Sequence, residues 1–120
     1  MRNIGLASCV CGGDAAEVAL ISTTSPDLLA VEPPELIGGG IAVSQARPEL
    51  LLETARAVRR AGFAGRLLCG AGIVTGTDVR AAIELGMDGV LVASSVVRSD
   101  DWRAKVFELA HPLSEAVSQS

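Results

Sequence analysis

The sequence has almost no aromatic side chains: Tyr is absent, and aromatic residues make up 2% of the chain. Proteins that bind single-stranded nucleic acids stack bases on aromatic rings, and this chain offers little material for such a surface. The formal net charge of −4 and the pI near 4.9 disfavour long-range attraction to nucleic acids and anionic membranes. We therefore expect no nucleic acid and no membrane as partner, although a local site for one small phosphate stays open.

Long apolar runs and a secretory signal are also missing. Gly, Pro, Ser and charged residues interrupt every hydrophobic stretch well before the roughly 20 residues that a membrane helix needs. Met1–Ile4 lacks the charged and then apolar build of a signal peptide. An odd number of cysteines, 3, favours a reducing compartment, so we expect a cytoplasmic location.

The cysteines do not follow a metal or redox pattern. Cys9 and Cys11 are separated by one residue rather than two, and Cys69 has no cysteine near it in the sequence. Thiols in core strands are therefore favoured over ligands, and we expect neither a metal nor a cofactor.

What the chain does contain is enough apolar material for one domain over residues 1–120. Hydrophobic residues make up 49% of the chain, and the mean hydropathy is +0.43. Apolar runs alternate with glycine-containing loops and segments of helical spacing, the rhythm of βα units. The predicted strands are Leu6–Cys11, Leu28–Val31, Arg66–Cys69 and Gly89–Val92. The predicted helices are Ala15–Ser22, one from Pro48 to Gly62, Asp78–Leu85, and one from about Ser99 toward Val117 that Pro112 kinks or divides.

The fold class is α/β with parallel strands, because four βα units with right-handed crossovers place consecutive strands side by side. The periodicity leaves open whether the helices lie on one face, as in a barrel, or on both faces, as in a doubly wound sheet. A complete (β/α)₈ barrel takes about 250 residues, so a chain of 120 holds about half of one.

Three loops with small residues follow predicted strands and therefore lie at one end of the sheet: Leu36–Gly40, Gly70–Gly72 and Ala93–Ser95. Small residues let backbone N–H groups approach a phosphate, and the following helix N-termini favour negative charge. Tight turns without a ligand would have the same composition. The spacing fits neither G-x-G-x-x-G nor a P-loop, which disfavours a dinucleotide or nucleoside triphosphate site.

Glu32 lies at the carboxyl end of a predicted strand. The following Pro33 holds Glu32 in an extended conformation at the rim of the sheet. A carboxylate fixed beside a mobile glycine-rich loop suits a base that takes a proton from carbon. The alternative is an ordinary solvated glutamate. Glu35, on the following loop, is expected to face solvent.

Three stretches together resemble the second half of the archaeal-type triosephosphate isomerases: Val31–Ser44 (VEPPELIGGGIAVS), Leu68–Gly76 and Gly89–Ser94. The resemblance runs from about Ile4 into the last helix. It implies a (βα)4 half of a TIM barrel, with Glu32 as the catalytic base. It also implies a lid containing Pro33, Pro34, Ile37, Gly39 and Gly40, and backbone donors to a substrate phosphate at Gly38, Ala71, Gly72, Ser94 and Ser95.

The departures from the family bear on activity. The family's catalytic Lys and His belong to the first half of its barrel, and here Lys105 and His111 are alone of their types and fall in the last predicted helix. Gly39 stands where the family usually has Thr, and Ser95 where it usually has Gly. We expect binding of a small phosphorylated ligand with little or no isomerase activity alone. One alternative is an active isomerase, formed as an oligomer or with a separate first half. The other is a structural relic, a chain that keeps the fold but binds no ligand.

A half-barrel exposes two sheet edges and an apolar inner face, which favours association. We expect a homodimer, or a higher homo-oligomer, that closes the barrel, or a separate N-terminal half as partner. The alternative is a sheet that opens and is covered by rearranged helices, as in a flavodoxin-like domain.

Overall fold

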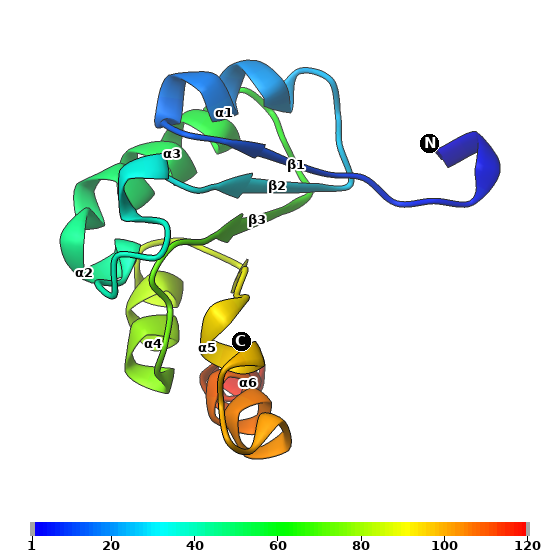
Figure 1. The fold of residues 1–120 in the computed structure, drawn as a ribbon. Coiled ribbons are helices and arrows are strands. Elements are labelled where there is room, and N and C mark those ends of the chain that lie inside the picture. Colours follow the sequence, from blue (N-terminus) through cyan, green and yellow to red (C-terminus); the bar gives the residue numbers. More distant parts are fainter. Residues whose placement is uncertain (1, 120) are drawn as a thin grey trace.

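The structure, a computed structural model, describes residues 2–119 and contains one parallel sheet (Figure 1). Its four strands follow one another in chain order: β1 (Cys9–Gly12), β2 (Leu28–Val31), β3 (Arg66–Cys69) and β4 (Gly89–Val90). The register aligns Cys11 with Ala30, Ala30 with Leu68, and Leu68 with Gly89. Among the described residues, β1 pairs only with β2 and β4 only with β3, so both outer edges of the sheet are unpaired.

The long helices form an arc along one face of the sheet (Figure 1). The helices are α1 (Ala15–Ser22), α2 (Val43–Ala46), α3 (Pro48–Arg60), α4 (Gly76–Glu84), α5 (Ser94–Val97) and α6 (Trp102–Gln119), with 3₁₀ turns η1 (Arg2–Ile4) and η2 (Pro34–Leu36). Helix α1 packs on α3, the short α2 contacts α3 and α4, and α4 packs on α6. This one-sided arrangement is that of a barrel wall rather than a doubly wound sheet, so the half-barrel expectation is confirmed.

The core lies between the sheet and this arc of helices. Side chains alternate along a strand, so every second residue faces the helices. The buried residues of this layer include Leu29, Val31, Leu67 and Cys69 from the strands, and Val18, Leu51, Val58, Val79 and Ala82 from the helices. Burial raises the pKa of the Cys69 thiol to about 12, so this cysteine is an inert core residue, as predicted.

The prediction that all three cysteines lie in the core is wrong for the two in β1. Cys9 and Cys11 have the opposite parity to Leu29 and Val31. Ala30, on the same side as Cys11 but in a central strand, is fully buried, so the two thiols are exposed because β1 is an edge strand. Their side chains face the concave side of the sheet, which no long helix covers in Figure 1. Leu68 of β3 is aligned with Cys11 through Ala30, so its side chain faces the same side, and it is also only half-buried.

Side-chain caps mark the starts of α1 and α4. The Asp14 carboxylate accepts from the Glu17 N–H at 2.8 Å, and α1 has the predicted bounds. Thr75 and Asp78 form a reciprocal capping box, with which α4 begins at Gly76, ahead of the predicted Asp78. Pro48 occupies the first turn of α3, as predicted, because its missing N–H has no intrahelical partner there.

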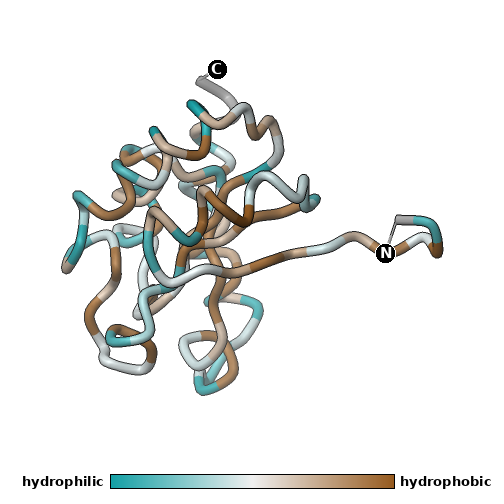
Figure 2. The backbone as a smooth tube through the Cα atoms, turned by 90° about the horizontal axis from the view of Figure 1, so that it is seen from above, coloured by the Kyte–Doolittle hydropathy of each residue, from teal (hydrophilic) through white to brown (hydrophobic). Residues whose placement is uncertain are grey.

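Four predicted boundaries are corrected. Residues Leu6–Ser8 precede the first strand instead of belonging to it, and this N-terminal segment extends away from the body in Figure 2. Strand β4 ends at Val90. The predicted loop Ala93–Ser95 runs into α5, because the Val96 and Val97 N–H groups both donate to the Ala93 carbonyl and close one turn. Helix α6 is not divided at Pro112.

The capping box of α4 gives a direct test of the fold. Replacing Thr75 by Ala removes the acceptor for the Asp78 N–H and should lower the free energy of unfolding by about 1 kcal/mol. The matched control is Thr77→Ala, on the exposed side of the same helix, which should change it by less than about 0.5 kcal/mol. Urea denaturation at one fixed protein concentration measures both; equal effects would contradict a capping role.

Candidate functional site

Glu32 stands at the carboxyl end of β2, at the rim of the sheet. Its backbone N–H donates to the Gly12 carbonyl at 2.9 Å, which continues the β1–β2 pairing by one residue. Pro33 is fully buried, with φ −65°, and fixes the chain as it leaves the strand. The carboxylate is therefore carried by a rigid strand end and not by a flexible loop.

The carboxylate of Glu32 occupies the space above Gly70, the residue that follows β3. A Cβ atom at Gly70 would meet the Glu32 carboxylate oxygen and would lie 3.3 Å from the Leu91 Cβ. Any other residue at this position would push the carboxylate aside. The sequence indicates only that Gly70 lies in a loop. Its position beside Glu32 follows from the pairing of neighbouring strands, since the Gly70 N–H donates to the Val31 carbonyl at 3.0 Å.

The Cys11 thiol also lies near the Glu32 carboxylate. Partial burial, then the neighbouring Cys9 thiol and Glu32 carboxylate, raise the pKa of the Cys11 thiol. The thiol stays protonated at neutral pH and is a poor nucleophile. Among the described residues, Glu32 forms no ion pair and accepts no hydrogen bond, so its half-buried carboxylate is available as a proton acceptor.

The predicted lid leaves the body of the protein after Leu36. Leu36 packs on the core, whereas Ile37 is exposed and added Cβ atoms at Gly38 and Gly40 would meet nothing within 4 Å. Both glycines have positive φ, +73° and +78°, a backbone conformation that side chains disfavour. Gly38 and Gly40 therefore face open space in this conformation, whereas the Gly39 N–H donates back to the Leu36 carbonyl at 3.1 Å.

The two ends of the lid are attached to the protein. At its start, Pro34 lies against Gly13, and the Glu35 carboxylate, although exposed as predicted, pairs with Arg47 at 3.0 Å. At its end, the Val43 N–H donates to the Ala71 carbonyl at 3.0 Å. Only the glycine-rich tip of the predicted lid therefore lies between these attachments.

Ala71 and Gly72 form a tight loop against this second attachment. Ala71 has φ +90° although it carries a side chain, and Gly72 has φ +71°. A Cβ atom at Gly72 would collide with the Ile41 carbonyl and with Ala42, so only glycine fits. The structure thus brings together Ala71, Gly72 and the end of the lid.

Ser94 and Ser95 begin α5, after the short loop Leu91–Ala93 that follows β4. Their backbone N–H groups donate to no carbonyl or side chain among the described residues. The Ser95 hydroxyl oxygen is buried and has no hydrogen-bond partner within the described part of the chain. An unsatisfied buried hydroxyl costs free energy, about 1–3 kcal/mol.

The structure does not bring every candidate into the site. Gly38 lies at the projecting tip of the lid and contacts neither phosphate loop in this conformation. Lys105 and His111 lie on α6, in the helical layer, as expected. The Lys105 ammonium donates to the Val74 carbonyl at 3.2 Å and pairs with Glu108 at 3.0 Å, and the His111 imidazole lies 2.8 Å from Glu115.

Other kinds of site find no support among residues 2–119. No group of three or more His, Cys, Asp or Glu side chains there is placed to hold a metal ion. No helix in this part of the chain is both long enough and apolar enough to span a membrane.

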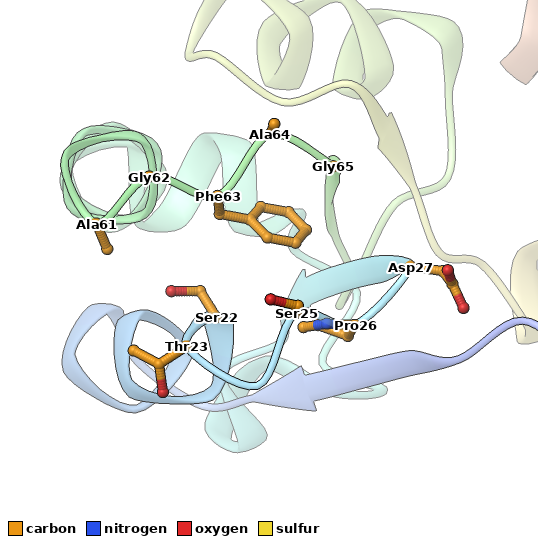
Figure 3. A pocket seen from close by; sticks show the side chains of 10 residues that line it. All are labelled: Ser22, Thr23, Ser25, Pro26, Asp27, Ala61, Gly62, Phe63, Ala64 and Gly65. Carbon is orange, nitrogen blue, oxygen red and sulfur yellow. The ribbon is translucent and has the colours of Figure 1, made fainter. Parts of the chain in front are cut away.

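A groove of about 610 Å³ lies at the opposite end of the sheet, where sequence reasoning placed nothing. Figure 3 shows Phe63 pointing into it from the loop after α3. The loop before β2 forms the other wall, and Asp27 there accepts from the Ser8 N–H at 2.7 Å. The groove lining contains no basic side chain, and it is separate from the rim that carries Glu32.

The comparisons with known proteins agree with this arrangement. The family model of triosephosphate isomerase matches residues 4–110. Triosephosphate isomerase of Cenarchaeum symbiosum is 53% identical over 114 residues, which cover 95% of this chain and 51% of the relative. That of Methanopyrus kandleri is 49% identical over 107 residues, covering 89% and 47%. The chain thus spans about half the length of the curated relatives it matches.

Solved structures share the fold at low sequence identity. The Amycolatopsis orientalis BexX/CysO complex gives a TM-score of 0.70 at 18% identity and covers 98% of this chain and 46% of that one. A crystal structure of mandelate oxidase gives 0.67 at 24% identity, covering 95% and 35%. These likenesses concern architecture alone. The family model and the archaeal relatives decide the assignment: the chain belongs to the triosephosphate isomerase family.

Proposed function

We propose that this chain is a triosephosphate isomerase half-barrel that binds a small phosphate or phosphorylated ligand at the carboxyl rim of its sheet, with little or no isomerase activity alone. The observation that carries the proposal is the buried, unpartnered hydroxyl of Ser95 beside the unpaired N–H groups at the start of α5. A phosphate oxygen would accept from these donors, and the dipole of even a short helical turn favours the negative charge.

The loop of Ala71 and Gly72 forms the other part of the proposed phosphate site, beside the start of α5. It follows β3, the neighbour of β4, so both loops lie at the same end of the sheet. Contact with Ile41 and Val43 couples this loop to the end of the lid. A ligand that orders the loop would therefore also affect the glycine-rich tip, whose Gly38 we propose as a further donor after closure.

Low activity follows from the missing electrophile. We propose Glu32 as the base, since its carboxylate is free and faces the concave side. Proton abstraction next to a carbonyl creates an oxyanion, and loss of one group that stabilises such charge costs about 10²–10³ in rate. The family places its Lys and His in the first half of the barrel, while Lys105 and His111 here are engaged on α6.

A second candidate function is isomerisation by an assembly that completes the barrel. The space that Gly70 leaves for the Glu32 carboxylate favours it, because a binding module without chemistry has no need of a carboxylate held in this position. A separate first half would add the Lys and the His, whereas a second copy of this chain would close the barrel without them.

Closure of the barrel belongs to the proposal as well. The unpaired edges of β1 and β4 and the uncovered concave face favour a homodimer, or a higher homo-oligomer, over a monomer. The three free thiols of the described chain support a reducing compartment, and we keep the cytoplasm as the proposed location.

Phosphate binding can be tested at Gly72. We expect saturable shifts of the amide signals of residues 71–72 and 94–95 when inorganic phosphate or glycerol 3-phosphate is titrated in an NMR experiment. Gly72→Ala should weaken binding roughly tenfold or more, because its Cβ collides with the Ile41 carbonyl and displaces the loop.

Gly62→Ala is the matched control for this titration. Gly62 also has positive φ, +90°, but an added Cβ there meets nothing within 4 Å. Both variants therefore carry the strain of a left-handed alanine, about 1–2 kcal/mol, and only Gly72→Ala should lose affinity. Unshifted amides in the wild-type chain would contradict the proposal and favour a relic without ligand.

The isomerase question is decided by complementation. In a coupled assay, the purified chain should show activity close to background, and addition of the first half of the Cenarchaeum symbiosum relative should raise it. Glu32→Gln should abolish the raised activity, because the amide cannot accept the proton. High activity of the chain alone, lost in Glu32→Gln, would refute the proposed inactivity.

Gly70→Ala tests the position of the carboxylate in the complemented assembly. Its Cβ meets the Glu32 carboxylate, so we expect kcat to fall by a factor of about 100 with little change in KM, because phosphate contacts stay in place. Gly62→Ala again serves as the control, since its Cβ enters open space away from the rim and should leave both kcat and KM nearly unchanged. An unchanged kcat in Gly70→Ala would contradict a role of Gly70 in positioning the Glu32 carboxylate.

A further inference from the structure

Helix α6 carries an exposed apolar surface, which we call the α6 stripe: Trp102, Val106, Phe107 and Ala110. Phe107 is 73% exposed and Trp102 62%, whereas Leu109, on another side of the helix, is buried in the core. The stripe lines a shallow groove of about 470 Å³ together with Arg103. The Trp102 indole N–H donates to the Val97 carbonyl at 3.0 Å, which holds the ring in place. Clustered aromatic side chains of this kind mark an interaction surface rather than scattered surface residues.

The opposite end of the helical arc exposes a smaller apolar surface. Leu20 of α1 is 72% exposed, and Ala16, one turn before it on the same face, is exposed too. The helix that packs on α1 is α3, on its other flank. Glu17, also exposed, and the capping Asp14 make the first turn of α1 acidic.

The sheet edges determine how these two surfaces can meet. In a closed parallel barrel, the strand after β4 is parallel to it, and its helix lies next to α6. If that strand is β1 of a second copy, the neighbour of α6 is α1 of that copy. Both helices then begin at the same end of the barrel and run side by side in the same direction.

The two surfaces correspond turn by turn in that arrangement. Helix α6 begins at Trp102 and α1 at Ala15. If the two starts are aligned, Arg103 lies level with Ala16 and next to Glu17. Phe107 then lies level with Leu20. A basic side chain thus lies beside the acidic first turn of α1, and the most exposed apolar residues of the two helices face each other.

We propose that the α6 stripe binds helix α1 of a second copy of this chain, in two identical contacts related by a two-fold axis. The inference rests on the proposed closure of the barrel and adds the surface that drives it. The chain carries both complementary surfaces at the two ends of one helical arc, with opposite charges at the same level, so a second copy needs no further partner.

The test measures self-association of the full chain by sedimentation velocity over a range of concentrations. The wild-type chain should be a dimer at low micromolar concentration. Phe107→Asp and Leu20→Lys should each raise the dissociation constant by a factor of about 100 or more, because each change occurs in both contacts of a two-fold dimer. Combining both changes in one chain should restore much of the association, since the carboxylate introduced on α6 of one copy would then face the ammonium introduced on α1 of the other.

Leu52→Asp is the control, since Leu52 is an exposed apolar residue on α3, in the middle of the arc. It should leave the dimer unchanged, and circular dichroism should show the same helix content in all variants. A wild-type dimer that neither Phe107→Asp nor Leu20→Lys weakens would overturn the stripe contact while leaving closure through the sheet edges standing.

A monomeric wild-type chain would overturn both closure by self-association and the stripe contact. If that monomer binds a separately expressed first half of the Cenarchaeum symbiosum relative, and Phe107→Asp abolishes the binding, the occupant of the stripe is that half and the second copy is wrong. The phosphate titration is independent of these results, so the two proposals fail separately.

Discussion

Within the described residues, the parallel sheet has helices on one face only, so its other face is uncovered and both of its edge strands lack a partner on their outer side. This constraint explains the main features of the molecule. Leu29 and Val31 are fully buried because helices cover their side of the sheet, whereas Cys9 and Cys11 are exposed although they lie in a strand. The same open face is where the Glu32 carboxylate lies, so the feature that makes the half-barrel incomplete also makes its candidate base accessible.

The rim is held mainly by the backbone and by small residues. Gly70 leaves room for Glu32, and Gly72 lets the loop after β3 touch the Ile41 carbonyl. Ala71 keeps a left-handed conformation that costs on the order of 1 kcal/mol, and its carbonyl accepts a hydrogen bond from the end of the lid. The exposed ion pair at the lid base adds at most about 1 kcal/mol. Backbone contacts, more than surface charges, therefore set the shape of this end of the sheet.

Local signals made the bounds of α1, β2 and β3 predictable, because caps and apolar runs act over a few residues. The short helices α2 and α5 were missed, since one turn of helix has no periodicity to detect. Cys9 and Cys11 are exposed because their strand lies at the edge of the sheet in the tertiary structure, and the sequence of a strand alone does not reveal its place in the sheet. A resemblance to a known family located Glu32 along the chain, yet its place above Gly70 and the unpartnered Ser95 hydroxyl arise between strands and need the tertiary structure.

Binding and catalysis place different demands on such a half-barrel. The candidate phosphate loops follow β3 and β4, which are neighbours, so one chain can position all of their donors. Stabilising a developing oxyanion requires charged or polar groups on the far side of the ligand, and the concave face of this chain ends at the edges of β1 and β4. In the proposed function, affinity for phosphate would therefore be a local property of this half-barrel, whereas isomerisation would require an assembly that completes the barrel. The two properties would then be separable by changing the partner without altering the rim.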